Sequence, residues 1–180
     1  MPNLEQEIRA LLDRQQIYEV LARYCRGVDR GDVELIRSVY HPDATDDHGM
    51  FKGLGVDFAP WIVEFLKDWK QCQHFIGNFN CNLQGDVAYT ETYCLSISDD
   101  GRGHNSAVYN RYIDRFERRN GEWKIADRLV VLDVSRVDPV TERFDSVPGW
   151  NFAWGQRNKN DPSYVASATA TQACVPTLSE

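Results

Sequence analysis

Four polar residues that are far apart in the sequence could together remove a proton from carbon and stabilise the charge that develops. An aspartate beside a histidine gives a carboxylate–imidazole base, in which the carboxylate orients the ring and stabilises the imidazolium. A tyrosine can donate a proton or hold an oxyanion, and an arginine supplies a fixed positive charge. Such a set suits proton abstraction beside a carbonyl, followed by loss of a leaving group. The candidates for these roles are Tyr24, Asp29, His74 and Arg128.

Each of these four residues also has a purely structural interpretation. The histidine could be a partly buried side chain at the start of a strand, and the aspartate could cap or turn the chain between two helices. The tyrosine lies on the apolar side of a helical pattern and could belong to the core. The arginine could form a surface ion pair with Asp114 or Glu117 on the neighbouring strand. The residue types alone leave these alternatives open.

The first third of the chain has the apolar spacing of helices. Residues 4–28 carry apolar side chains at helical intervals, which predicts a helix with one face turned inward. Asp32 is a suitable N-cap for a second helix over residues 33–40. Residues 41–53 are expected to form a loop with a short extended piece, and residues 56–69 a third helix.

Beyond Lys70 the pattern changes to that of strands. The Asn120-Gly121 pair lies between two runs of β-forming residues and is a strong hairpin signal. Helices that are separated along the chain from an antiparallel sheet predict an α+β fold. A further short strand is expected near residues 49–52. The four main strands are predicted over residues 72–84, 86–98, 105–119 and 122–136.

The length of 180 residues predicts one domain, which we place at residues 1–138. The chain after it, residues 139–180, is rich in proline and polar residues but also contains large aromatic side chains, among them Phe144, Trp150, Phe152 and Trp154. We therefore expect an irregular arm that packs on the domain or on a neighbouring subunit.

Composition excludes several classes of function. The net charge of −7 argues against a nucleic-acid partner, which requires a basic surface. The sequence has no apolar run long enough to span a membrane, and its N-terminus is polar and acidic, unlike a signal peptide. The five cysteines are odd in number and lack a C-x-x-C spacing, which is typical of reduced thiols in a cytoplasmic protein.

A second group of polar residues could bind a metal ion, since it contains two histidines and three carboxylates within eight positions. Its spacing matches no established metal site, including the EF-hand loop. The simpler interpretation is a solvated loop, and we predict no metal site. The members of this group are His41, Asp43, Asp46, Asp47 and His48.

Three segments resemble the SnoaL-like branch of the nuclear-transport-factor-two-like superfamily. They are RGVDRGDVELIRSVYHPDA (26–44), QHFIGN (73–78) and YIDRFERRNGEWKIADR (112–128), and the resemblance covers about residues 8–136. It implies a cone-shaped fold, in which a strongly curved antiparallel sheet wraps around a pocket that three N-terminal helices close. These segments are similar to those of scytalone dehydratase, hexachlorocyclohexane dehydrochlorinase and bile-acid 7α-dehydratase. These enzymes use an Asp–His dyad and no cofactor.

The resemblance also implies roles for the four candidates. Asp29 and His74 match the dyad, Tyr24 matches a tyrosine of the bile-acid enzyme, and Arg128 matches an arginine on the last strand. One departure is the strand at residues 86–98, which lacks the second pocket histidine of scytalone dehydratase. Scytalone is therefore an unexpected substrate. The residues that could take the place of that histidine are Glu91, Thr92 and Tyr93.

The resulting hypothesis is a cofactor-independent lyase, dehydratase-like, or an isomerase with similar proton chemistry. The substrate would be a mostly apolar cyclic molecule that is aromatic, steroid-like or polyketide-like, and the protein a homo-oligomer, either a trimer or a dimer. A non-catalytic small-molecule binding protein and a β-type subunit of a ring-hydroxylating dioxygenase remain alternatives. The expected pocket walls are Tyr18, Phe51, Trp61, Phe65, Tyr93, Tyr109 and Val130.

Overall fold

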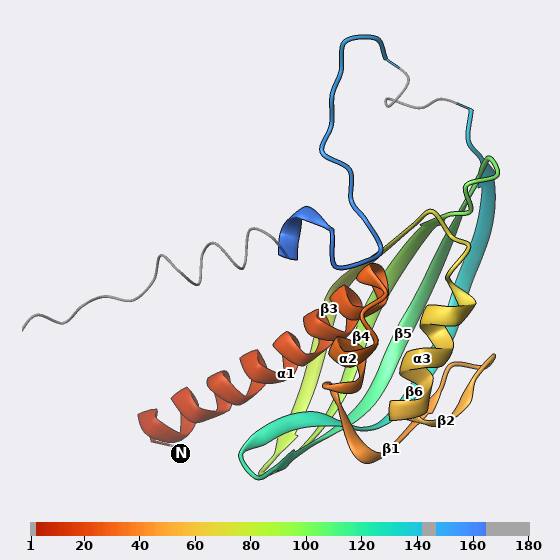
Figure 1. Cartoon of the computed structure of the whole chain (residues 1–180). Helices are drawn as coiled ribbons and strands as arrows, with labels where there is room; N and C mark the ends of the chain where they lie inside the picture. Colours follow the sequence, from red (N-terminus) through yellow and green to blue (C-terminus); the bar gives the residue numbers. More distant parts are fainter. Residues whose placement is uncertain (1–2, 142–146, 165–180) are drawn as a thin grey trace, which may run out of the picture.

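The structure is a computed structural model that describes residues 3–141 and 147–164. Three helices precede and interrupt a six-stranded sheet (Figure 1). Residues 142–146 and 165–180 of the predicted arm lie outside the described residues, and the division of the chain at residue 138 stays a prediction. The elements are α1 (Leu4–Arg30), α2 (Val33–Arg37), β1 (Tyr40–Asp47), β2 (Lys52–Leu54), α3 (Gly55–Phe65), β3 (Gln71–Gln84), β4 (Val87–Asp99), β5 (His104–Arg119) and β6 (Glu122–Pro139).

Capping residues determine where the first two helices begin and end. Asn3 and Gln6 form a reciprocal capping box at the start of α1. Gly31 ends this helix in the left-handed conformation, with φ 61°. The side chain of Asp32 then accepts a hydrogen bond from the backbone N–H of Leu35, which confirms its predicted role as the N-cap of α2.

The strands form one curved, unclosed sheet in the order β2-β1-β6-β5-β4-β3. The four long strands form the predicted antiparallel meander. At its last turn Asn120 and Gly121 both have positive φ, as the hairpin signal requires. Register shifts between Gly77 and Phe79 and within β5 add to the curvature.

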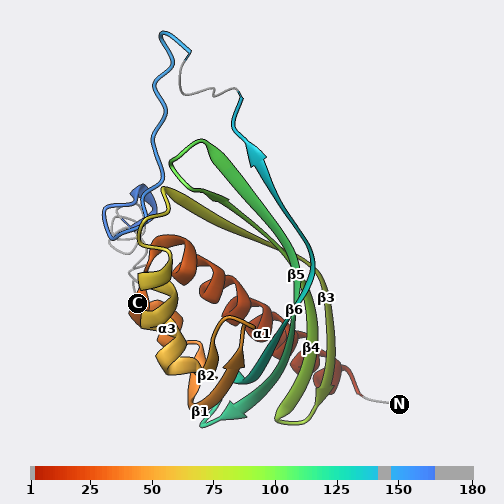
Figure 2. The ribbon, with the colours of Figure 1, turned by 90° about the vertical axis from the view of Figure 1, so that its right-hand side faces the viewer.

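Helices α1 and α3 lie on the concave side of the sheet, and the main core lies between these two layers (Figure 2). This arrangement confirms the predicted α+β class and is that of the cone fold. Aliphatic and aromatic side chains from both layers are fully buried there. Among them are Ile17, Leu21, Val39, Phe58, Phe116 and Ile125.

Strand β1 was not predicted by the sequence. Residues 33–40 were expected to be helical and residues 41–53 to form mainly a loop, but α2 ends at Arg37 and β1 begins at Tyr40. The strand pairs in parallel with β6 on one side and antiparallel with β2 on the other. These two strands provide hydrogen-bond partners for the backbone of β1, although its sequence, YHPDATDD, locally favours turns.

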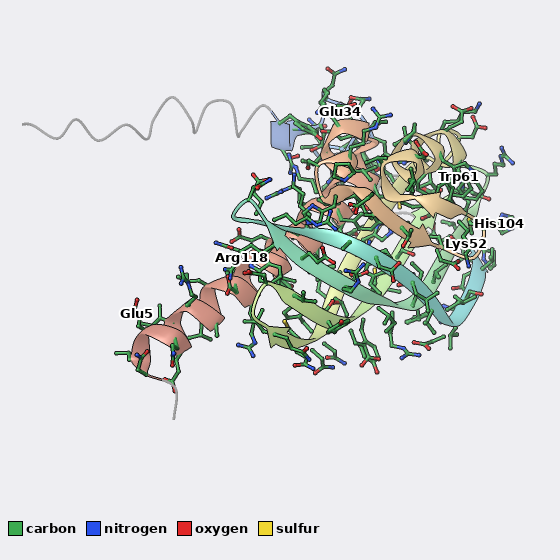
Figure 3. All side chains as sticks on the ribbon, turned by 90° about the horizontal axis from the view of Figure 1, so that it is seen from below. Glu5, Glu34, Lys52, Trp61, His104 and Arg118 are labelled. Carbon is green, nitrogen blue, oxygen red and sulfur yellow. The ribbon has the colours of Figure 1, made fainter. Side chains whose placement is uncertain are left out.

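The N-terminal half of α1 extends beyond the sheet, as the position of Glu5 in Figure 3 shows. Its apolar side chains were expected to face inward, but they are largely exposed. Ile8 and Leu12 line a surface hollow together with Arg118 at the end of β5. The exposed residues are Leu4, Ile8, Leu11 and Leu12. In the described part of the chain, no helix is long and apolar enough to cross a membrane.

Candidate functional site

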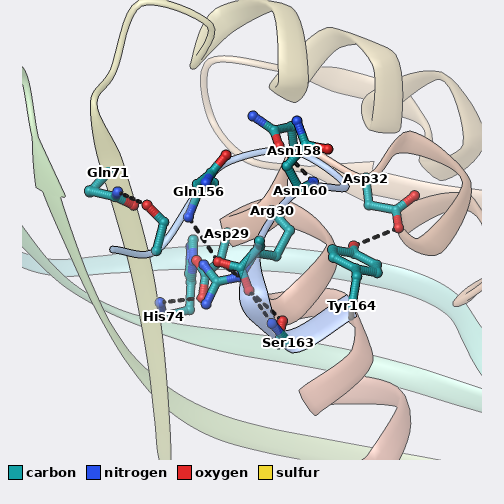
Figure 4. Close-up of polar contacts among 12 residues, drawn as sticks. Asp29, Arg30, Asp32, Gln71, His74, Gln156, Asn158, Asn160, Ser163 and Tyr164 are labelled. Atoms are coloured by element: carbon teal, nitrogen blue, oxygen red, sulfur yellow. Dashed lines mark hydrogen bonds and ion pairs between the residues drawn. The ribbon is translucent and has the colours of Figure 1, made fainter. Parts of the chain in front are cut away.

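Asp29 and His74 form a hydrogen-bonded pair on the helical side of the sheet. Asp29 lies in the last turn of α1, and His74 lies near the start of β3. The ring nitrogen Nδ1 of His74 is 2.6 Å from Oδ1 of Asp29, and the backbone N–H of His74 donates to Oδ2 at 3.1 Å (Figure 4). Both carboxylate oxygens are therefore engaged by one residue, which fixes the imidazole in place.

The environment of His74 favours a basic imidazole. Burial on its own lowers the pKa of His74 and favours the neutral ring. The hydrogen bonds to Asp29 and Cys72 outweigh this effect and hold the pKa of His74 well above its usual value of 6.5. Within residues 3–141 and 147–164, every hydrogen bond of this ring involves Nδ1. When the ring is neutral, Nε2 therefore carries an unshared lone pair that can accept a proton.

The thiol of Cys72 lies beside this pair, with Sγ 3.8 Å from Nδ1 of His74. Potential ligand atoms of Asp29, Cys72 and His74 lie within 4.8 Å of one another, so these residues could be considered for a metal ion. Two ligands bonded at about 2.0 Å around a tetrahedral zinc ion would lie roughly 3.3 Å apart. The 2.6 Å between Nδ1 and Oδ1 is instead a hydrogen-bond distance.

Arg128 is fully buried and forms a bidentate ion pair with Asp114, at 2.7 and 2.8 Å. Asp114 was one of its two expected partners, but the pair lies in the core and not at the surface. The guanidinium carbon is 4.2 Å from the ring centres of both Tyr24 and Tyr112. Among the described residues, none forms a hydrogen bond with Nη1 of Arg128.

Tyr24 belongs to the core and also carries a polar contact. Its ring packs against Tyr112 of β5, whose side chain is on the same side of the sheet as Arg128. Its hydroxyl is 3.0 Å from Nε2 of His48. Burial, opposed by Arg128, raises the pKa of Tyr24 well above 10 and keeps the phenol protonated.

The structure corrects the interpretation of residues 41–48 as a solvated loop. Asp46 is fully buried, and its carboxylate accepts a short hydrogen bond from Nδ1 of His48 and another, at 2.6 Å, from the hydroxyl of Tyr40. The His48 side chain is 15% exposed and its ring stacks on Phe58, with 4.2 Å between the ring centres. The sequence pattern does not reveal this pair, because the turn-favouring residues of β1 hide the strand that buries Asp46.

The other three members of that group point to different partners. His41 bonds the backbone carbonyl of Glu117. Asp43 pairs with Arg119, and Asp47 pairs with Lys52. The five side chains therefore do not converge on one point, and the geometry gives them no shared ion.

The predicted wall residues divide between the two faces of the sheet. Strand alternation places Thr92 and Cys94 inward, so Tyr93 between them faces outward. Tyr109 faces outward as well, beside a register shift, and the two tyrosines line a surface hollow with Phe75. These two predicted wall residues therefore lie on the opposite face of the sheet from His74.

Three of the remaining wall candidates are partly buried and pack on the core: Phe51, Trp61 and Val130. Tyr18 packs edge-on against Phe79 of β3. Phe65 stacks on Trp61 but is 48% exposed. Of the residues considered as a substitute for the missing histidine, Thr92 is the one that faces inward, and its Oγ1 has no hydrogen-bond partner in the described structure.

Part of the C-terminal segment packs beside the Asp29–His74 pair (Figure 4). The side chain of Gln71 donates to the backbone carbonyl of Gly155 at 2.5 Å. The carboxylate of Asp32, next to the end of α1, accepts hydrogen bonds from Lys159 and Tyr164. These contacts hold residues 155–164 against the end of α1 that carries Asp29.

The family model for the SnoaL-like domain matches residues 9–129. The chain belongs to the SnoaL-like family. The uncharacterised protein Rv2910c of Mycobacterium tuberculosis strain H37Rv is 23% identical over 127 residues, which cover 68% of this chain and 86% of that protein.

Two solved structures share the fold with this family member. A provisionally named scytalone dehydratase from Novosphingobium aromaticivorans DSM 12444 is 16% identical, with a TM-score of 0.65, and the match covers 74% of this chain and 97% of that one. The hexachlorocyclohexane dehydrochlorinase LinA-type3 from Novosphingobium barchaimii LL02 is 19% identical, with a TM-score of 0.64 and coverage of 81% and 97%. At these identities the likeness shows the fold alone.

Proposed function

We propose that this protein is a lyase of the dehydratase type that works without a metal or an organic cofactor. The observation that carries the proposal is the 2.6 Å hydrogen bond between Asp29 and Nδ1 of His74. In the part of the chain that the structure describes, Nε2 of the same ring forms no hydrogen bond. The names of the two structural neighbours, a dehydratase and a dehydrochlorinase, support an elimination reaction.

In the proposed reaction, Nε2 of His74 removes a proton from the carbon beside a carbonyl group. Asp29 keeps the ring in the required tautomer and stabilises the imidazolium. Arg128 supplies positive potential as negative charge develops on the carbonyl oxygen, although Asp114 offsets part of that charge. Tyr24 donates a proton to the departing hydroxyl group. An isomerase would share the first step and return the proton to another carbon.

The proposed substrate is a mostly apolar cyclic β-hydroxy ketone. A simple probe is a phenyl-substituted cyclohexanone with a hydroxyl group β to the carbonyl, referred to as the hydroxy probe. Loss of water converts it into a conjugated enone, which is followed by ultraviolet absorbance.

The test compares the wild type with His74→Gln on the hydroxy probe. We expect kcat/KM to fall by about 10²–10⁴, the usual contribution of a general base. The matched control is His104→Gln, because His104 is an exposed histidine that also pairs with an aspartate, Asp100, at 3.3 Å. Wild-type activity in His74→Gln would remove this histidine from the mechanism.

A second candidate function is a small-molecule binding protein without catalysis. It is favoured by the bidentate pairing of Arg128 with Asp114, which neutralises the guanidinium before any ligand arrives. A binding protein would hold an aromatic ketone without converting it, and the affinity would be insensitive to His74→Gln.

A further inference from the structure

A second Asp–His pair lies on the same side of the sheet as the first, and Tyr24 connects to it. Nδ1 of His48 is hydrogen-bonded to the buried carboxylate of Asp46, and its Nε2 is 3.0 Å from the Tyr24 hydroxyl. The arrangement repeats that of Asp29 and His74, with one difference. Among the described residues, the second ring nitrogen of His74 has no hydrogen-bond partner, whereas that of His48 lies within hydrogen-bond distance of Tyr24.

Neighbouring residues hold this second pair rigidly. The ring of His48 stacks on Phe58, and the other oxygen of Asp46 accepts from Tyr40. The groups bonded to the His48 ring are Asp46 on β1 and Tyr24 on α1. The carboxylates of Asp47 on β1 and Asp114 on β5 also lie within electrostatic reach of it.

A proton donated by Tyr24 alone would leave a buried tyrosinate. The core around Tyr24 opposes this anion, since burial raises the pKa of the phenol well above 10. A neighbour that returns a proton to the tyrosine oxygen in the same step avoids the anion. His48 is within hydrogen-bond distance to do so.

We infer that Asp46, His48 and Tyr24 form a proton-delivery chain, and that the leaving group of this site is therefore an alcohol oxygen that must be protonated as it departs. The inference rests on the proposed function and names its substrate class. His48 acts through Tyr24 and is a positioning and relay residue, whereas Tyr24 would touch the substrate.

In the dehydration of a β-hydroxy ketone, three proton transfers accompany the loss of water. His74 takes the proton from carbon, the carbon–hydrogen electron pair forms the double bond, and the carbon–oxygen bond breaks with its electron pair on oxygen. The Tyr24 hydroxyl proton moves to that oxygen, which leaves as water, while the Nε2 proton of an imidazolium at His48 moves to the tyrosine oxygen. His74 then loses one proton to solvent and His48 gains one, which restores both residues.

Two probes that differ only in the leaving group test this chain. One is the hydroxy probe, and the other is the acetate ester of the same alcohol, referred to as the acetate probe. Both give the same enone. Acetate departs as a stable carboxylate and needs no proton, so only the hydroxy probe depends on proton delivery.

For His48→Gln we expect kcat/KM on the hydroxy probe to fall by about 10²–10⁴, and on the acetate probe by less than about tenfold. Asp46→Asn should change the ratio of the two rates in the same direction. The control His104→Gln, which removes an exposed histidine, should leave the ratio unchanged. A structural role of His48 would instead slow both probes equally, and that result would overturn the inference.

A double variant separates a relay from independent contributions. If the proton reaches the substrate only through Tyr24, then Tyr24→Phe with His48→Gln should be no slower on the hydroxy probe than Tyr24→Phe alone. Multiplicative losses would contradict the chain. A wild type that converts the acetate probe but not the hydroxy probe would support proton abstraction and reject the inference. A wild type that converts neither probe would contradict the proposed function itself, and with it the inference.

Discussion

Replacing Asp29 with asparagine tests how the carboxylate controls His74. In the wild type the two carboxylate oxygens accept from Nδ1 and from the backbone N–H of His74, so this position requires two acceptors. Asparagine has only one acceptor oxygen. Its NH₂ group must therefore face either the backbone N–H or the ring nitrogen.

Each orientation of the asparagine has a calculable cost. If NH₂ faces the backbone N–H, a buried donor loses its partner, at about 1–3 kcal/mol of stability. If NH₂ faces Nδ1, the ring must accept there and carry its proton on Nε2, which removes the lone pair that acts as the base. Asp29→Asn should therefore lose about 1–3 kcal/mol of folding free energy in the first orientation, or about 10²–10⁴ in kcat/KM on the hydroxy probe in the second.

The pH dependence gives a second measure of the same substitution. The base must be neutral, so kcat/KM rises with pH through the pKa of His74, which lies well above 6.5 in the wild type because of the bonds to Asp29 and Cys72. Asp29→Asn removes the carboxylate that raises the pKa of His74 against the effect of burial. The rising limb of the kcat/KM profile should therefore move to lower pH. The assay is kcat/KM against pH, with urea unfolding of both proteins. Full activity and an unmoved limb in the variant would refute this reasoning.

Because the pKa of His74 is raised in the folded state, protonation of this ring stabilises the fold. The stabilisation is fully present below the unfolded pKa of 6.5 and is lost as pH rises through the folded pKa. The unfolding free energy of the wild type should therefore exceed that of His74→Gln by more at pH ~5.5 than at pH ~9. Arg128→Met should lower the unfolding free energy, measured with urea, by about 3–5 kcal/mol, because it leaves the Asp114 carboxylate buried without its partner. The double variant Arg128→Met, Asp114→Leu should recover most of this free energy. Additive losses in the double variant would contradict this prediction. The exposed aromatic side chains of the outer sheet face could become buried between the subunits of a homo-oligomer. In that case the double variant Phe75→Lys, Tyr93→Lys should have a lower molecular mass than the wild type in analytical sedimentation. An unchanged mass would exclude this face as the subunit interface.

Sequence reasoning located most of the fold because its strongest signals are local. The cap at Asp32 and the Asn120-Gly121 turn depend on a few neighbouring residues, and both are present in the structure. Asp29 and His74 are 45 positions apart in the sequence, and only the family resemblance indicated that they lie close together.

The missed features depend on partners that are distant in the sequence. Strand β1 forms because β6 lies beside it, and its own residues include a proline and three aspartates that favour a loop. Once that strand exists, Asp46 is buried and bonds the ring of His48. The outward position of Tyr93 follows from the burial of Thr92 and Cys94 on either side of it in β4, and the face that is buried depends on the helices that cover it.

The central claim is that His74 removes a proton from carbon, and deuterium exchange measures that step without requiring a leaving group to depart. Phenylcyclohexanone lacking the β-hydroxyl would be incubated in heavy water with the wild type or with His74→Gln, and exchange beside the carbonyl followed by NMR. We expect the wild type to catalyse exchange and His74→Gln to be slower by about 10²–10⁴. Equal exchange by both proteins would contradict the claim.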